Sequence, residues 1–214
     1  MKNLYIIGAG GFGREVAWLV ERINVINPTW VLQGFIDDNQ ELWGTEIDGY
    51  PVMGGIAWLA SQEESWCVCA VGAARTRKKI IEKASEYSNI HFATLVDPTV
   101  QMSRRIEIGE GTIICAGCIL TVDIKIGKHV IVNLDCTVGH DAVISDYVTL
   151  YPSVNVSGIT EIGACAELGT GMQIIQGKSV GNGSIIGAGA VVVRDIPDNC
   201  VAVGSPAKVI KIID

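Results

Sequence analysis

Several features that would place a protein at a membrane or on a nucleic acid are missing from this sequence. No stretch of about 18 uninterrupted apolar residues is present, as a membrane-spanning helix requires. Residues 1–20 lack the charged, apolar and small-residue segments of a signal peptide, so we expect a cytoplasmic protein. Positive charge is scarce, since 16 Lys and Arg against 23 Asp and Glu give a net charge of −7. Nucleic acids and anionic membranes bind basic surfaces, so neither is an expected partner.

Histidine occurs only three times, and the seven cysteines are an odd number scattered through apolar runs. This distribution disfavours a disulfide framework and indicates reduced, mostly buried thiols. Cys115 and Cys118 have the spacing of a metal-binding knuckle, but no second cysteine pair or histidine cluster accompanies them. We therefore expect no metal site.

Aromatic residues are also unevenly distributed. All five tryptophans lie in the first 66 residues, and the only aromatic residues after Phe92 are Tyr147 and Tyr151. This shift predicts a boundary near residue 94, with one domain over residues 1–94 and a second over residues 95–214.

The second domain has a six-residue period. Every sixth residue is apolar: Val96, Met102, Ile108, Ile114, Leu120, Ile126, Val132, Val138, Ile144, Leu150, Val156, Ile162, Leu168, Ile174, Val180, Ile186 and Val192. Neither a helix (period 3.6) nor a plain strand (period 2) has this spacing, but a hexapeptide β-helix does. Three hexads make one coil of a triangular prism, the aliphatic side chains point inward, and residues 18 apart stack about 4.8 Å from each other.

Tight corners between hexads need residues that accept a positive φ. Gly or Asp occupies the third position after many of the inward residues: Gly111, Gly117, Asp123, Asp135, Asp141, Gly171, Gly177, Gly183 and Gly189. The pattern therefore predicts turns at these nine positions.

This repeat resembles the hexapeptide-repeat acyltransferases. The segment from Gly204 to Lys208, Gly-Ser-Pro-Ala-Lys, is similar to the element with which that family closes its coenzyme A site. The resemblance implies a left-handed prism, a homotrimer and acetyl-CoA as cosubstrate. A β-helical scaffold without catalysis is the alternative.

The first domain reads as a small Rossmann-like βαβαβ unit. A strand over Leu4–Ile7 leads into the glycine loop Gly8–Gly13 and a helix from Arg14, an arrangement that holds phosphates on backbone N–H groups. Further apolar runs follow over Val31–Ile36 and Trp66–Val71. NAD binding is the competing hypothesis, but about 90 residues supply only one of the two halves that a dinucleotide needs.

Together the two domains resemble the sialic acid O-acetyltransferase-like family, which includes N-acetyltransferases of UDP-4-amino sugars in bacillosamine synthesis and of GDP-perosamine. In that family the N-terminal unit binds the nucleotide sugar. The residues that the resemblance assigns to this role are Gly8, Gly10, Gly11, Phe12, Gly13, Asp37, Asp38 and Arg77. Phe12 departs from the family, since many relatives have histidine there.

Acyl transfer from a thioester needs a base near neutral pH, for which histidine is suited. His91 lies at the domain junction and is interpreted as structural, and His129 as a turn residue. His140 follows the inward Val138 by two residues, which places it on an exposed edge, and it matches the family's base. Gly158 stacks on it one coil later and would leave an open slot for the thioester.

Other residues support this site. Asp141 either orients His140 or is a plain corner residue, and both interpretations are open. By resemblance Asn133 supports the active site, with a corner contact or asparagine ladder as its alternative. The resemblance also assigns Gly158, Thr170, Ala188 and Lys208 to coenzyme A. Thr170 and Ala188 belong to a different edge from His140, which predicts that neighbouring subunits of a trimer each supply one edge.

Three functions are consistent with the sequence. The first is N-acetylation of a UDP- or GDP-linked amino sugar for surface glycan synthesis, and the second is O-acetylation of a sialic acid-type sugar. The third is a non-catalytic trimer that binds nucleotide sugars, against which the presence of His140, Gly158 and the Gly204–Lys208 segment speaks. The residues do not select the sugar, the nucleotide base or the length of the acyl group.

Overall fold

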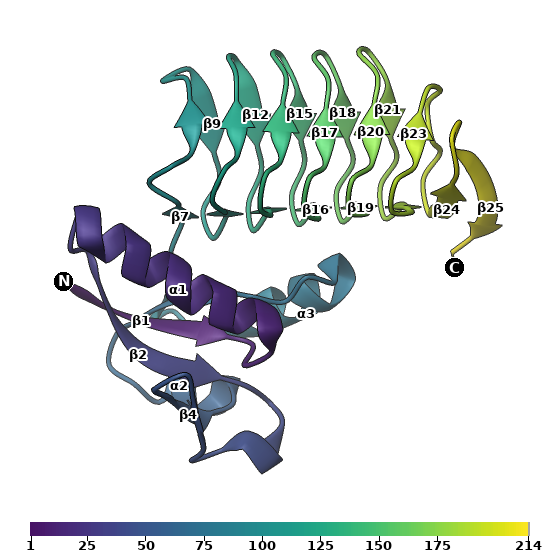
Figure 1. The fold of residues 1–214 in the computed structure, drawn as a ribbon. Helices are drawn as coiled ribbons and strands as arrows, with labels where there is room; N and C mark the ends of the chain where they lie inside the picture. The colour runs from purple at the N-terminus through teal and green to yellow at the C-terminus, as the bar shows by residue number, and fades with distance from the viewer. Residues whose placement is uncertain (214) are drawn as a thin grey trace. The chain divides into compact units, whose positions relative to one another are not determined.

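The structure is a computed structural model that describes residues 1–213, and the chain divides into two compact units (Figure 1). Unit 1 comprises Met1–Gly72 with Thr76–Pro98, and unit 2 comprises Ala73–Arg75 with the chain from Thr99 onward. None of the helices in residues 1–213 is long and apolar enough to cross a membrane.

Unit 1 is built on a mostly parallel sheet. Its elements are β1 (Lys2–Ile7), α1 (Gly11–Ile26), β2 (Trp30–Ile36), the short 3-10 helix η1 (Gln40–Leu42), β3 (Glu46–Ile47), β4 (Tyr50–Gly54), α2 (Ile56–Ala60), β5 (Ser65–Cys69), α3 (Ala74–Ala84) and β6 (Ile90–Phe92). The strand order is β3-β4-β2-β1-β5-β6. Only β3, against β4, is antiparallel among the pairs in this described sheet.

The three strands predicted in this half are present as β1, β2 and β5, and their apolar residues form the core, with Leu4, Ile6 and Phe35 fully buried. The strands β3, β4 and β6 and the helix α2 were not predicted. β3 and β6 are two and three residues long and β4 contains a proline, so none of them carries a clear strand pattern.

Helix α1 begins at Gly11, three residues earlier than the sequence predicted. The reason lies in the glycine loop, where the backbone of α1 packs tightly against the end of β1. A Cβ at Gly13 would overlap the carbonyl oxygen of Gly8, and Gly8 itself has a φ of +105°. Glycine at both positions therefore lets the helix start directly after the strand.

Unit 2 is a parallel β-helix with three faces, whose coils lie one after another along Figure 1. Face A contains β10 (Ile113–Ile114), β13 (Ile131–Val132), β16 (Thr149–Leu150), β19 (Glu167–Leu168), β22 (Ile185–Ile186) and β24 (Cys200–Val203), with β25 (Lys208–Ile212) antiparallel to β24. Face B contains β8 (Gln101–Met102), β11 (Ile119–Leu120), β14 (Thr137–Val138), β17 (Asn155–Val156), β20 (Gln173–Ile174) and β23 (Val191–Val192). Face C contains β9 (Ile106–Ile108), β12 (Ile124–Ile126), β15 (Val143–Ile144), β18 (Glu161–Ile162) and β21 (Ser179–Val180). The short strand β7 (Leu95–Val96), whose residues belong to unit 1, precedes these coils in the chain.

The predicted 18-residue register is confirmed on all three faces, where Ile114 pairs with Val132, Leu120 with Val138 and Ile126 with Ile144. Each predicted inward residue from Ile114 to Val192 is buried, with at most 4% of its surface exposed. Val96 and Ile108 are only partly buried, and the prediction was wrong for Met102, which is 46% exposed. β8 is the first strand of face B in the chain and lies at the end of that sheet, so no preceding coil covers that side chain.

The nine predicted corners are confirmed, since each has a φ between +56° and +79°. His129 also has a positive φ, +53°, as expected for a turn residue. Four corners were not predicted because their residues are not usual in this conformation: Tyr147, Ser153, Ile159 and Cys165.

Candidate active site

Two edges of the prism carry the candidate residues. At edge AB the chain turns from face A to face B, over residues 133–136, 151–154, 169–172 and 187–190. At edge BC it turns from face B to face C, over residues 121–123, 139–142, 157–160 and 175–178.

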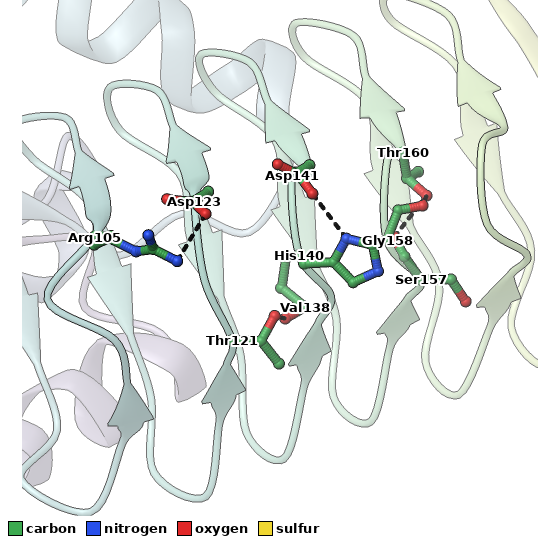
Figure 2. Close-up of polar contacts among 9 residues, drawn as sticks. All are labelled: Arg105, Thr121, Asp123, Val138, His140, Asp141, Ser157, Gly158 and Thr160. Carbon is green, nitrogen blue, oxygen red and sulfur yellow. Dashed lines mark hydrogen bonds and ion pairs between the residues drawn. The ribbon is translucent and has the colours of Figure 1, made fainter.

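His140 and Asp141 form a pair on edge BC (Figure 2). His140 Nδ1 lies 2.8 Å from Asp141 Oδ2, and the two side chains are 49% and 59% exposed. The N–H of Asp141 donates to the carbonyl of Val122, which holds the corner at a φ of +58°. Because the carboxylate accepts from Nδ1–H, the neutral ring keeps its lone pair on Nε2, as a general base requires.

Gly158 faces this imidazole, as the stacking prediction required. A Cβ at Gly158 would lie 2.6 Å from His140 Nε2 and 2.7 Å from Cε1, so only a glycine leaves the ring in place. The N–H of Ile159 donates to the carbonyl of His140 at 2.8 Å, which ties the two coils together at this point. The imidazole therefore faces the bare backbone of Gly158, with no side chain between them.

Thr160 supports the Gly158 turn and was not predicted to do so. Its buried hydroxyl donates to the carbonyl of Ser157 at 2.7 Å (Figure 2). Thr160 lies four residues after the inward Val156, at a position where the repeat requires only a small residue. Its hydroxyl group was the feature of the sequence that could have indicated this role.

Asp123 occupies the corner one coil before Asp141, with nearly the same φ of +56°. It pairs with Arg105 rather than with a histidine, at 3.1 Å (Figure 2). Both partners are well exposed, at 67% for Arg105 and 45% for Asp123, so the ion pair contributes little to stability. Asp123 and Asp141 thus occupy equivalent corners, but only Asp141 has a histidine as its partner.

The remaining predicted residues of this domain lie elsewhere. Asn133, Thr170 and Ala188 are on edge AB, and Lys208 begins β25. The Asn133 side chain is nearly buried and accepts from the N–H of Leu134 at 2.7 Å, the corner contact that was its alternative interpretation. One chain therefore brings His140, Asp141 and Gly158 together on edge BC, and holds the edge AB residues on the other side of face B.

The other two histidines, His129 and His91, pack against neighbouring aromatic side chains. His129 is 4% exposed and stacks on Tyr147 with ring centroids 5.4 Å apart. His91 packs against Trp66 and has its Nε2 3.6 Å from a Glu64 carboxylate oxygen.

Unit 1 contains a cavity of about 200 Å³ at the carboxyl ends of β1, β2 and β5. Its lining is Ile7, Gly8, Ile36, Asp37, Asp38, Ile56, Val71, Thr76 and Ile80. In a parallel sheet this end is where ligands bind. Three predicted residues, Gly8, Asp37 and Asp38, therefore share one cavity with a largely aliphatic wall.

The carboxylates of the cavity already hold the surrounding loops. Asp37 accepts from the N–H groups of Ala9, at 3.0 Å, and Asn39, at 2.9 Å. Asp38 accepts from the N–H of Ile56 at 3.3 Å and lies 3.3 Å from Lys83 Nζ. The N–H of Ala9, one donor of the expected phosphate loop, is therefore occupied by Asp37.

The other predicted residues of unit 1 surround the loop. Gly10 and Gly11 lie at the start of α1, where an added Cβ would meet nothing closer than 4.0 Å, and the partly exposed Phe12 follows them. Arg77 is 1% exposed, and its guanidinium donates to the carbonyls of Val71 and Gly72 at 2.7 and 3.0 Å. Arg77 thus orders the loop after β5 from within the protein.

Residues 3–84 match the family model of the PglD N-terminal domain. No curated protein matches the sequence. Among solved structures, the acetyltransferase domain of PglB from Neisseria gonorrhoeae, in complex with acetyl coenzyme A, is 33% identical, with a TM-score of 0.88 over 98% of this chain and 99% of that one.

Two further structures are similar over comparable lengths. Perosamine N-acetyltransferase from Caulobacter crescentus, in complex with CoA and GDP-perosamine and with one histidine replaced by asparagine, is 30% identical, with a TM-score of 0.87 over 98% of this chain and 97% of that one. WeeI from Acinetobacter baumannii is 31% identical, with a TM-score of 0.87 over 98% and 100%.

Proposed function

Since the chain belongs to the hexapeptide-repeat sugar N-acetyltransferases, whose second domain is a left-handed parallel β-helix, we propose that it transfers the acetyl group of acetyl-CoA to the amino group of a nucleotide-linked sugar. Such a product would feed surface glycan synthesis. Its cosubstrate would be available in the cytoplasm, where we propose that it acts. The observation that carries the assignment is the His140 imidazole, oriented by Asp141 and open toward Gly158.

The proposed reaction follows from this geometry. His140 Nε2 removes a proton from the neutral sugar amine as the nitrogen attacks the thioester carbonyl, so that the N–C bond forms and the C–S bond breaks. The imidazolium then returns the proton to the departing thiolate, and N-acetyl sugar and CoA leave. Asp141, 2.8 Å from Nδ1, stabilises the positive charge on the ring between these steps.

The nucleotide would bind in the cavity of unit 1. The isoleucines and Val71 there suit the faces of a base, and Asp37 and Asp38 are acceptors for the N–H or hydroxyl groups of a nucleoside. The glycine loop and the start of α1 would face the phosphates, with Arg77 positioning the loop after β5 rather than contacting the ligand. The proposed acceptors are GDP- and UDP-linked amino sugars, and the Caulobacter relative binds GDP-perosamine.

Coenzyme A would lie between two copies of the chain. Gly158 is on edge BC, whereas Thr170 and Ala188 are on edge AB, and two edges of one prism cannot converge on one ligand. A homotrimer in which edge BC of one copy meets edge AB of the next would unite them and bring Asn133 near a neighbour's site. Lys208 would contribute from the end of the prism.

The test is acetyl transfer to UDP- and GDP-linked 4-amino sugars and to their 4-hydroxy counterparts. We expect activity on one amino sugar, and we expect His140→Ala to lower kcat by about 10² to 10⁴ with the affinity for acetyl-CoA nearly unchanged. Transfer only to the hydroxyl sugars would instead identify an O-acetyltransferase. If His140→Ala kept more than half of the activity, His140 would not be the base.

A further inference from the structure

Ile159 adopts a backbone conformation that is unfavourable for a β-branched residue. Its φ is +55°, in the left-handed region. The other non-glycine residues with positive φ in the described chain are Asp48, Asp123, His129, Asp135, Asp141, Tyr147, Ser153, Cys165 and Asn199. Ile159 is the one β-branched residue among these ten positions of residues 1–213, and for such a side chain a positive φ is a strained outlier.

Core packing does not explain this choice of residue. Ile159 is 53% exposed, so much of its apolar side chain faces solvent where Asp, Asn or Gly would be more stable. Strain that no burial offsets is characteristic of functional positions.

The position of Ile159 points to its role. It follows Gly158 directly and stacks one coil after Asp141, and its N–H donates to the carbonyl of His140 at 2.8 Å. Ile175, on the next coil of edge BC, is 43% exposed. The two coils that follow His140 therefore each carry an exposed isoleucine on edge BC, Ile159 directly after Gly158 and Ile175 one coil further.

We propose that Ile159, with Ile175 beyond it, is the apolar contact for the cysteamine and acyl end of the acetyl-CoA donor. This inference rests on the proposed acetyltransferase function. The methylenes next to the thioester and the acetyl methyl group are apolar, and burial against Ile159 removes both surfaces from water. The contact holds the thioester carbonyl beside His140 Nε2 and keeps water away from it.

The test separates binding from stability. In Ile159→Asn the new residue accepts a positive φ, so the apo protein should unfold about 2–4 °C higher than wild type while acetyl-CoA binds about tenfold more weakly. Ile159→Val keeps an apolar contact and should bind nearly as wild type. Cys165→Asn, at a corner with a φ of +58° outside edges AB and BC, is the matched control and should not change the affinity.

Binding is measured by isothermal titration of acetyl-CoA into the full chain without a sugar acceptor, together with thermal unfolding and the oligomeric mass of each variant. Wild-type affinity in Ile159→Asn would overturn the inference and leave the proposed function intact. Dissociation of the assembly in Ile159→Asn would also overturn it, since Ile159 would then face a second copy. If wild type itself failed to bind acetyl-CoA, both proposals would fall.

Discussion

Replacing Gly158 by alanine adds a single methyl group at the candidate site and tests the placement of the base. The new Cβ would lie 2.6 Å from His140 Nε2, 2.7 Å from Cε1 and 2.9 Å from Cδ2. Non-bonded carbon and nitrogen atoms approach to about 3.5 Å, so the ring must move by about 1 Å. A movement of that size breaks the 2.8 Å contact between Nδ1 and Asp141 or turns Nε2 away from the slot.

We expect Gly158→Ala to lower kcat/KM by about 10²-fold, the usual effect of misplacing a catalytic group by about 1 Å. The fold should be retained, because Gly158 does not have a left-handed φ and the three closest atoms all belong to a side chain that can rotate.

A double-mutant cycle provides the control. In a His140→Ala background the ring is gone, so Gly158→Ala should cause little further loss if it acts through the imidazole. The assay is steady-state acetyl transfer, with circular dichroism and thermal unfolding to verify the fold. A folded Gly158→Ala protein with more than half of the wild-type kcat/KM would refute the placement of the base, and equal losses in both backgrounds would show that Gly158 acts independently of His140.

Two further variants test the neighbouring groups. In Asp141→Asn the new residue tolerates the same positive φ, and kcat should fall by about 10–10²-fold because an amide does not stabilise the imidazolium. The control is Asp123→Asn, one coil earlier, where the native Asp123 pairs with Arg105; this variant should keep the wild-type rate. Equal rates in the two variants would show that Asp141 is only a corner residue. Gly11→Glu places a carboxylate at the start of α1, where space is open, and should abolish nucleotide-sugar binding in titrations while acetyl-CoA binding survives. The neutral Gly11→Gln should retain binding, and normal sugar-nucleotide binding by a folded Gly11→Glu protein would remove the glycine loop from the site.

The repeat made the second unit predictable to the level of single residues. A hexad period specifies which side chains point inward, and the 18-residue coil specifies which residues stack, so the proximity of His140 and Gly158 followed from counting. The first unit lacks such a period. Its β1, β2 and β5 were predicted from apolar runs, whereas the short strands β3, β4 and β6 depend on pairing with neighbours and were missed.

The sequence by itself determined the parallel β-helix, its register and the edge on which His140 lies, because these properties repeat along the chain and need no knowledge of distant contacts. Only the tertiary structure decided how individual side chains are engaged. It directed Asp37 to the N–H of Ala9 and buried Arg77 behind the loop after β5. Each of these depends on a hydrogen bond between a particular side chain and a backbone group of another segment, and no period in the sequence encodes such a contact.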